Sequence, residues 1–339
     1  MTIFLVSFLS VAKLVLVVLL GVVLGKRGVI TKEGRACLSN IIMMVMLPCL
    51  LVASLSQNAS VENLGKLPML MVAAAVYVAF GLLVAALLRR VFRIGPENAR
   101  IIGAATSFGN ASYLPLPLLA AVCASAPVFA DDPSGALSRS VAYVSIFLMC
   151  HSPLLWLVAF PYLSGHSWRE LRLRQVLNMP ILASTTGVIL GTVPFLRALI
   201  VDADAPLRIV IDSCELVSQG VFPCALLVLG ATLAQRLPAG ESVPLRVFSV
   251  VALGKLVLMP VLGFFFTMAL WRGGLIPDDP VCVLVLMLEA AVPPANNLII
   301  MCQMHQRGEA VMARVLLVMY CLAVPSLTIA MMCFLKVIS

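Results

Sequence analysis

Long apolar stretches, separated by short charged or turn-forming segments, make up most of this 339-residue chain. Hydrophobic residues account for 62% of it and charged residues for 11%, a composition that a water-exposed surface does not tolerate. Because a membrane-crossing helix needs about 20 apolar residues, the sequence predicts an all-α polytopic membrane protein. The ten expected spans lie near residues 3–24, 36–56, 67–88, 99–124, 140–163, 176–196, 208–234, 244–271, 281–304 and 310–336.

Basic residues divide unequally between the two sides of the membrane that these spans define. Fifteen Lys and Arg residues fall on one side and six on the other, which also carries the acidic pairs Asp131-Asp132 and Asp278-Asp279. The positive-inside rule places the more basic side in the cytoplasm. We therefore expect both termini to be non-cytoplasmic and the connection after the fifth span to be cytoplasmic.

Short sequence motifs recur at corresponding positions in the two halves of the chain. Gly21–Gly25 in the first span resembles Gly187–Gly191 in the sixth, and Leu47–Cys49 in the second resembles Phe222–Cys224 in the seventh. A repeat of five spans enters the membrane in opposite orientations, so we expect an inverted repeat, which is common among secondary transporters. The expected organisation is a first five-helix repeat (1–163), a short linker (164–175) and a second five-helix repeat (176–339).

The fourth and ninth spans, which correspond in the two halves, both contain helix-breaking residues. Proline removes a backbone donor and clashes with the preceding turn, and unwound backbone survives in a bilayer only where it lines a cavity or is packed in protein. We therefore expect the fourth and ninth spans to be broken helices. The residues that indicate the breaks are Gly109, Pro115 and Pro117 in the fourth span and Pro293 and Pro294 in the ninth.

Each break frees amide groups at the start of a half-helix, where the helix dipole favours an anion. Nearby asparagines add neutral donors, so the sequence predicts a carboxylate site between the breaks. The alternative is a pair of proline kinks in packed helices, with asparagines that bond between helices. The residues expected to bind substrate are Asn110, Asn297, Asn296, Tyr113, Ser107 and Ser112.

Ionisable residues within spans are costly and are functional candidates. Glu289 lies one turn before Pro293, and Lys255 lies in the middle of the eighth span. We expect them to form a buried pair, which either locks two helices together or couples transport to protons through Glu289. His151 is expected to be a satisfied polar residue of the core.

Motifs for other classes of protein are absent from the sequence. The ten cysteines lie almost all in apolar runs with no CxxC pair, and the three histidines belong to no HExxH motif. We therefore expect no metal, no cofactor, no nucleic-acid partner and no enzymatic activity. A channel or a receptor-like membrane sensor stays open as an alternative, because broken helices also occur in pores.

Several longer stretches resemble the PIN-LIKES branch of the auxin efflux carrier family over nearly the whole chain. They are Phe108-Gly109-Asn110 through Leu114-Pro115, Pro293 to Asn297 with Gln303, and Val193-Pro194-Phe195-Leu196-Arg197 through Asp212-Ser213-Cys214-Glu215 to Pro223-Cys224. The resemblance implies ten spans with two crossed broken helices, carriage of indole-3-acetic acid or a related organic anion, and residence in the endoplasmic reticulum membrane.

The family's crossover asparagines fall on Asn110 and Asn297. Two positions depart from the family pattern, since Tyr113 replaces a second asparagine and Asn296 replaces a methionine. Both lie in the expected pocket. The expected partners are a small organic anion and the lipid bilayer, with a homodimer left open. We expect a secondary transporter that works by alternating access, with another organic anion as the alternative cargo.

Overall fold

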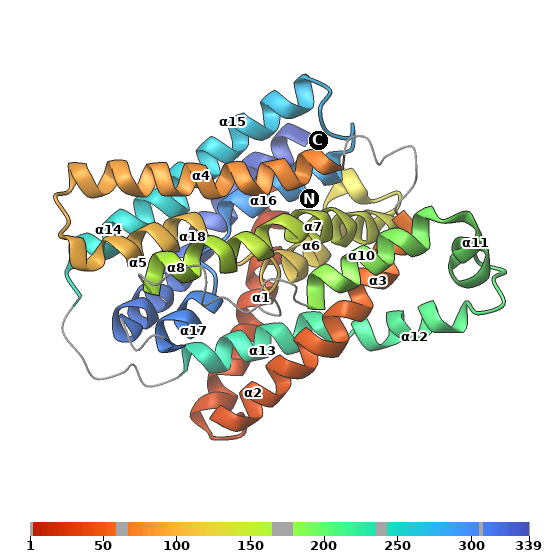
Figure 1. Ribbon diagram of the computed structural model, residues 1–339, viewed down its shortest axis with the longest axis horizontal. Helices are drawn as coiled ribbons and strands as arrows, with labels where there is room; N and C mark the ends of the chain where they lie inside the picture. The colour runs from red at the N-terminus through yellow and green to blue at the C-terminus, as the bar shows by residue number, and fades with distance from the viewer. Residues whose placement is uncertain (1–2, 59–66, 165–178, 235–242, 305–307, 339) are drawn as a thin grey trace.

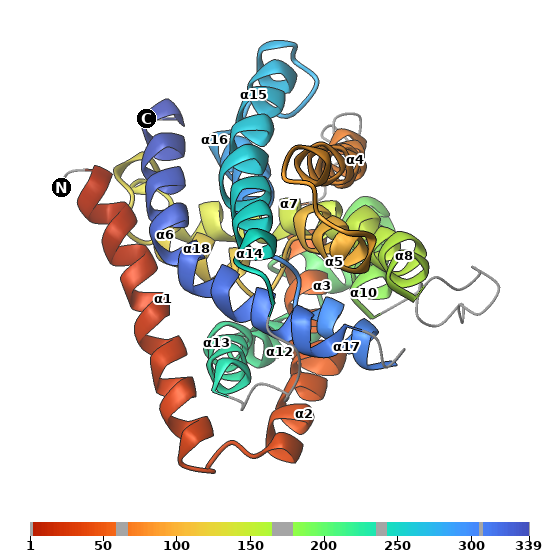
Figure 2. The same cartoon turned by 90° about the vertical axis from the view of Figure 1, so that its left-hand side faces the viewer.

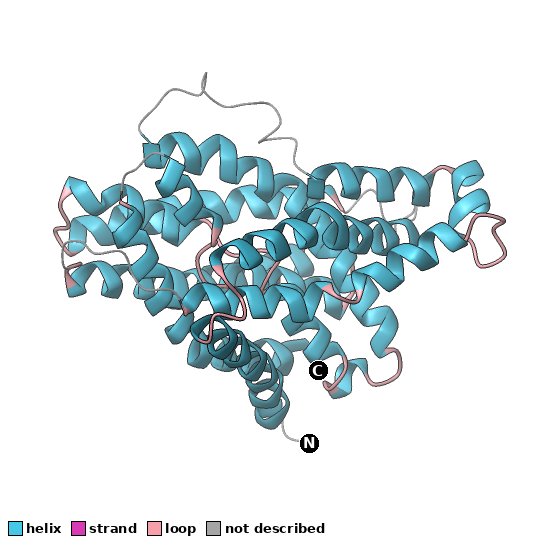
Figure 3. Ribbon diagram, turned by 90° about the horizontal axis from the view of Figure 1, so that it is seen from below, coloured by secondary structure: helices cyan, strands magenta, loops and turns pink. Residues whose placement is uncertain are grey.

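The structure, a computed structural model, describes residues 3–58, 67–164, 179–234, 243–304 and 308–338. The described chain is helical, and Figure 3 draws it as helices joined by loops. Within these ranges six helices are long and apolar enough to cross a membrane, or seven if one bent pair counts as a single span. The fold is that of a polytopic helical membrane protein. The ten spans and the inverted repeat stay predictions.

The first half of the chain supplies one long N-terminal helix and several that are interrupted. The 164–175 linker, apart from Ser164, lies outside the described residues. The elements of this half are α1 (Ile3–Lys26), α2 (Lys32–Ile41), η1 (Ile42–Met46), α3 (Leu47–Asn58), α4 (Pro68–Val91), α5 (Pro96–Ser107), α6 (Pro115–Cys123), η2 (Pro127–Phe129), α7 (Pro133–Leu154), η3 (Leu155–Ala159) and α8 (Phe160–Ser164).

The second half ends in the longest described helix, α18. Its elements are α10 (Met179–Thr192), α11 (Pro194–Leu196), η5 (Arg197–Val201), α12 (Ile209–Ser218), α13 (Val221–Leu233), α14 (Leu245–Ala252), η6 (Leu253–Leu258), α15 (Met259–Arg272), α16 (Pro280–Ala291), α17 (Asn297–Met304) and α18 (Glu309–Ile338).

The expected sixth span, 176–196, is bent near its end. α10 ends at Thr192, and the following segment Pro194–Val201 turns away by 91°. Val193 is extended, with φ −85° and ψ 110°, because proline disfavours helical backbone in the residue before it. Pro194 is visible in the sequence, but the sequence does not predict the angle of the bend.

Close glycine contacts join helices from opposite halves of the chain. A Cβ atom at Gly230 of α13 would lie 2.0 Å from the Val18 carbonyl oxygen of α1, and one at Gly21 would lie 2.5 Å from the Leu227 oxygen. α10 meets α3 in the same way, since a Cβ at Gly187 would lie 2.8 Å from Leu55 Cβ. Small residues allow helix backbones to approach closely in membranes. The first span therefore packs on the seventh, and the sixth on the second.

The helices form two groups by their packing. In the first group α13 packs on α1, α10 and α12 pack on α3, and η1 joins the two sets by contacting α13 and α3. The second group consists of α4, α5, α7, α14, α15, α16 and α18. Figures 1 and 2 place α4 and α15 at one edge of the molecule and α13 and α2 at the opposite edge. The two groups meet along α3 and α7 and along α1 and α18.

Candidate substrate site

Two helices of the second group are interrupted where the sequence predicted breaks. α5 ends at Ser107 and α6 begins at Pro115, while α16 ends at Ala291 and α17 begins at Asn297. Pro115 and Pro117 lie in the first turn of α6, where a missing backbone donor costs nothing. Pro293 and Pro294 lie in the non-helical segment between α16 and α17.

The two breaks satisfy each other's backbone. The Asn110 N–H donates to the Pro293 carbonyl over 2.8 Å, and the Ala295 N–H donates to the Phe108 carbonyl over 2.9 Å. These bonds form one antiparallel bridge between Gly109 and Pro294. Buried backbone groups without partners are costly in a bilayer, so this exchange allows both helices to unwind at one place.

We call the place where residues 108–110 lie against residues 293–295 the crossing. A glycine is required at position 109 because the two segments lie so close together there. A Cβ atom at this position would lie 2.8 Å from Val292 Cγ2 and 3.1 Å from the Lys255 ammonium nitrogen. The residue therefore carries no side chain because the partner break and a buried lysine occupy that space. A helix-breaking role, which the sequence predicted, is only part of the reason for this glycine.

Asn110 braces the crossing through its side chain. Its Nδ2 donates to the Tyr320 hydroxyl over 2.6 Å, and its Oδ1 accepts the Tyr113 N–H over 3.1 Å. Tyr320 in turn donates to the Pro294 carbonyl over 3.2 Å. Sequence reasoning missed Tyr320, although a tyrosine within an apolar span is a signal, because its hydroxyl needs a partner when buried.

A small pocket lies against the crossing, on the boundary between the two helix groups. Met43, Leu47 and Pro180 contribute from the first group. Its volume of ≈ 50 Å³ has room for a few water molecules, so an aromatic ring enters only after the groups separate. The other lining residues are Gly109, Asn110, Ala111, Ser112, Tyr113, Leu148, His151, Ser152, Leu155, Ala295, Asn296 and Asn297.

Five of the six residues expected to bind substrate line this pocket, and Ser107 does not. Ser107 is buried in the last turn of α5, where its hydroxyl donates to the Gly103 carbonyl over 2.7 Å. Asn296 and Asn297 are half-buried, and within the described chain neither their side chains nor their backbone N–H groups donate a hydrogen bond. These two asparagines therefore present unused polar groups to the pocket.

His151 lies at the same pocket, which the sequence did not anticipate. It is 5% exposed, and its ring centroid lies 5.5 Å from that of Phe147 and 5.9 Å from that of Phe108. The aromatic contacts fix the ring against the wall of the pocket. It is the one histidine among the residues that line this site.

Lys255 and Glu289 are both buried beside the crossing, with exposed fractions of 1% and 4%. Lys255 belongs to η6, a π-helical stretch, and such stretches often mark functional places in helices. No ion pair within 4.0 Å joins the two side chains in the described structure, and both carboxylate oxygens of Glu289 are without a hydrogen-bond partner there. They are neighbours but not a closed ion pair.

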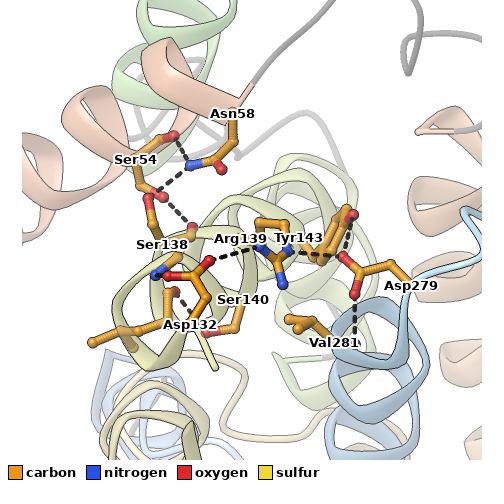
Figure 4. A network of polar contacts seen from close by, with 11 residues as sticks. Ser54, Asn58, Asp132, Ser138, Arg139, Ser140, Tyr143, Asp279 and Val281 are labelled. Atoms are coloured by element: carbon orange, nitrogen blue, oxygen red, sulfur yellow. Dashed lines mark hydrogen bonds and ion pairs between the residues drawn. The ribbon is translucent and has the colours of Figure 1, made fainter. Parts of the chain in front are cut away.

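A polar network joins α3, α7 and α16 away from the pocket (Figure 4). Asn58 donates to the Ser138 hydroxyl over 2.7 Å, and Ser54 donates to the Ser138 carbonyl over 2.6 Å. Arg139 forms ion pairs with Asp132 at 3.4 Å and with Asp279 at 3.1 Å. Because α3 belongs to the first helix group and α7 to the second, the Ser138 bonds tie the groups together.

No cluster of three or more His, Cys, Asp or Glu side chains that could hold a metal ion lies within the described ranges. What the site offers is a polar pocket at mid-helix breaks inside an apolar helical protein. Together the fold and the site define a membrane transporter.

The chain belongs to the membrane transport protein family, whose model matches residues 6–166 and 166–331. It is similar to Protein PIN-LIKES 5 of Arabidopsis thaliana, with 25% identity over 88% of each chain. Protein PIN-LIKES 3 of the same plant is 23% identical over 96% of each chain. Protein PIN-LIKES 1 is 24% identical over 96% of this chain and 78% of its own length. The resemblance to the PIN-LIKES branch is therefore confirmed.

Proposed function

We propose that this protein is a secondary transporter that carries an organic monocarboxylate anion by alternating access. The observation that carries the proposal is the polar pocket at the crossing of two broken helices, placed between two helix groups. Indole-3-acetic acid is the first substrate to test, because the family resemblance implies it. The same resemblance leads us to propose the endoplasmic reticulum as the membrane, and the distribution of Lys and Arg supports non-cytoplasmic termini.

The carboxylate binds at the start of α17 in this proposal. The backbone N–H groups and the side-chain amides of Asn296 and Asn297 donate no hydrogen bond within the described chain. The N-terminus of a helix also carries the positive end of its dipole. The start of α6 is a poorer site, since Pro115 and Pro117 have no N–H to donate. The Tyr113 ring, also at the pocket, packs against the aromatic part of the substrate.

Alternating access follows from the two helix groups. Leu47, at the start of α3, lines the pocket, and Asn58 is the last residue of the same helix. The eleven residues between these positions correspond to about 16 Å along the helix axis. The ties at Ser138 therefore close one side of the crossing while the pocket lies toward the other. By the positive-inside rule the closed side is non-cytoplasmic, so we assign the structure to a state that is closed on the non-cytoplasmic side.

An inverted repeat supports this mechanism. Gly21 and Gly187 occupy corresponding places in the proposed repeats, 1–163 and 176–339, and each packs on the second span of the opposite half. Such an exchange is what a two-fold axis in the membrane plane produces. Movement of the second helix group about this axis would expose the pocket to each side in turn.

Lys255 and Glu289 are the proposed coupling groups. The buried carboxylate of Glu289 lacks a hydrogen-bond partner, which is unusual for a buried polar group. We propose that a proton occupies it during part of the cycle, with Lys255 as the fixed charge beside the crossing.

The test is uptake of radiolabelled indole-3-acetic acid into proteoliposomes, with and without an imposed proton gradient. We expect saturable uptake that Asn297→Ala abolishes, and a gradient effect that Glu289→Gln removes. The matched control is Ser107→Ala, because Ser107 does not line the pocket. Absence of saturable uptake by the folded wild-type protein would reject this substrate. Equal uptake by wild type and Asn297→Ala would reject the site.

A further inference from the structure

A second cavity lies between α1 and α18, on the other face of the crossing. It has a volume of ≈ 310 Å³. On α1 it is lined by every third or fourth residue from Val11 to Lys26, a single helix face about 22 Å long. Its opposite wall is α18 from Leu317 to Leu327, and Leu118 of α6 and Leu233 of α13 complete it. We call it the α1–α18 groove.

The groove is apolar except at one end. Tyr320 presents its ring, since its hydroxyl is bonded to Asn110 and to the Pro294 carbonyl. Lys26, the last residue of α1, is the one charged residue among the lining side chains, and it is exposed. Arg27 follows it directly. The groove thus combines a long hydrocarbon wall with a cation at the end that the charge distribution assigns to the cytoplasmic membrane surface.

We infer that this groove is a binding site for an anionic phospholipid. One acyl chain lies along α1 between Val11 and Val22, and the headgroup phosphate pairs with Lys26. The length of the apolar wall and the single terminal cation match the two parts of such a lipid. A lysine at the membrane surface adds about 1 kcal/mol of attraction for an anionic lipid, while the chain itself gains little over bulk bilayer.

Other occupants fit less well. A small soluble anion would use Lys26 but leave the apolar wall uncovered. A zwitterionic lipid such as phosphatidylcholine also has a phosphate, but its choline cation would lie beside Lys26 and Arg27 and offset the attraction. The acyl chain would cover the ring of Tyr320, so the occupied groove supports the residue that braces the crossing. The inference depends on the groove alone and stands whether or not the protein carries indole-3-acetic acid.

The test is native mass spectrometry of the full chain, purified in detergent and equilibrated with equal amounts of phosphatidylglycerol and phosphatidylcholine. We expect the wild type to retain phosphatidylglycerol preferentially. Lys26→Gln should lower that preference about fivefold, the equivalent of about 1 kcal/mol. Arg27→Gln removes the same charge from a neighbour that does not line the groove and should have a smaller effect.

A second pair of variants tests the acyl-chain part. Leu19 lines the groove and is 52% exposed, while Leu16 is 67% exposed on α1 and lies outside it. Leu19→Trp should fill the groove and reduce retention of both lipids, and Leu16→Trp should not. Equal lipid retention by these two variants, or equal effects of Lys26→Gln and Arg27→Gln, would overturn the inference.

Discussion

The structure gives the two crossover asparagines different roles, and substitution with alanine separates them. Asn110 is 4% exposed and its side chain makes two hydrogen bonds, to Tyr320 and to the Tyr113 amide. Asn297 is half-buried, and no hydrogen bond joins its side chain to the described chain. We therefore expect Asn110→Ala to destabilise the protein and Asn297→Ala to impair transport without destabilising it.

The magnitude follows from the bonds that are lost. An intramolecular hydrogen bond contributes about 0.5–1.5 kcal/mol, so Asn110→Ala should lower the free energy of unfolding by about 1–3 kcal/mol. At about 2 °C per kcal/mol for a large chain, its Tm should fall by about 2–6 °C. Asn297→Ala should change stability by less than about 0.5 kcal/mol, as substitutions that break no internal contact do.

The assay is thermal unfolding in detergent, followed by uptake at matched protein content. Tyr320→Phe is the comparison variant, because it removes the hydroxyl that accepts the Asn110 bond and also donates to the Pro294 carbonyl. The double variant should be less destabilised than the sum of the two single variants, since both remove one shared bond. A Tm unchanged in Asn110→Ala, or lowered as much in Asn297→Ala, would refute this division of roles.

Three further substitutions test packing and gating. Gly230→Ala places a Cβ 2.0 Å from the Val18 carbonyl oxygen and should cost about 1–3 kcal/mol by overpacking; thermal unfolding measures it against Gly34→Ala, which has room. Gly109→Ala should abolish uptake at equal reconstituted protein, because its Cβ meets the partner break. Ser138→Ala removes the hydroxyl that accepts the Asn58 bond, and hydrogen exchange at the start of α7 should rise about fivefold for a loss of about 1 kcal/mol; unchanged exchange would contradict the gating role.

The sequence was sufficient to locate the helix breaks, because their cause is local. Proline disfavours the interior of a helix, and the closely spaced prolines Pro115 with Pro117 and Pro293 with Pro294 coincide with the interruptions. A single proline is not sufficient, since Pro153 and Pro325 lie inside α7 and α18. The same reasoning placed Asn110 and Asn297 beside them. The sequence also indicated that Lys255 and Glu289 are close to each other, although not that their charged groups stay apart.

The remaining features depend on contacts between distant segments. Tyr320 reaches Asn110 across 210 positions, and no periodicity in the tenth span reveals that contact. Ser107 has the residue type of a binding group, but its position in the last turn of α5 leaves the Gly103 carbonyl within reach, and a helical serine commonly bonds back in this way. The close approach of α1 and α13 could not be predicted either, because a glycine motif in an apolar span does not indicate which helix packs against it.

The two breaks pair part of their backbone with each other and leave other groups, among them the N–H groups of Asn296 and Asn297, without a partner in the described chain. Asn110 and Ala295 each donate to a carbonyl of the other break, so either break alone would leave unpaired groups that cost several kcal/mol in a bilayer. In the proposed transport cycle we therefore expect the two breaks to move together. The amides at Asn296 and Asn297 lie outside this exchange, and the substrate carboxylate is the partner that we assign to them. Binding the anion thus completes a hydrogen-bonding arrangement that the protein itself leaves open.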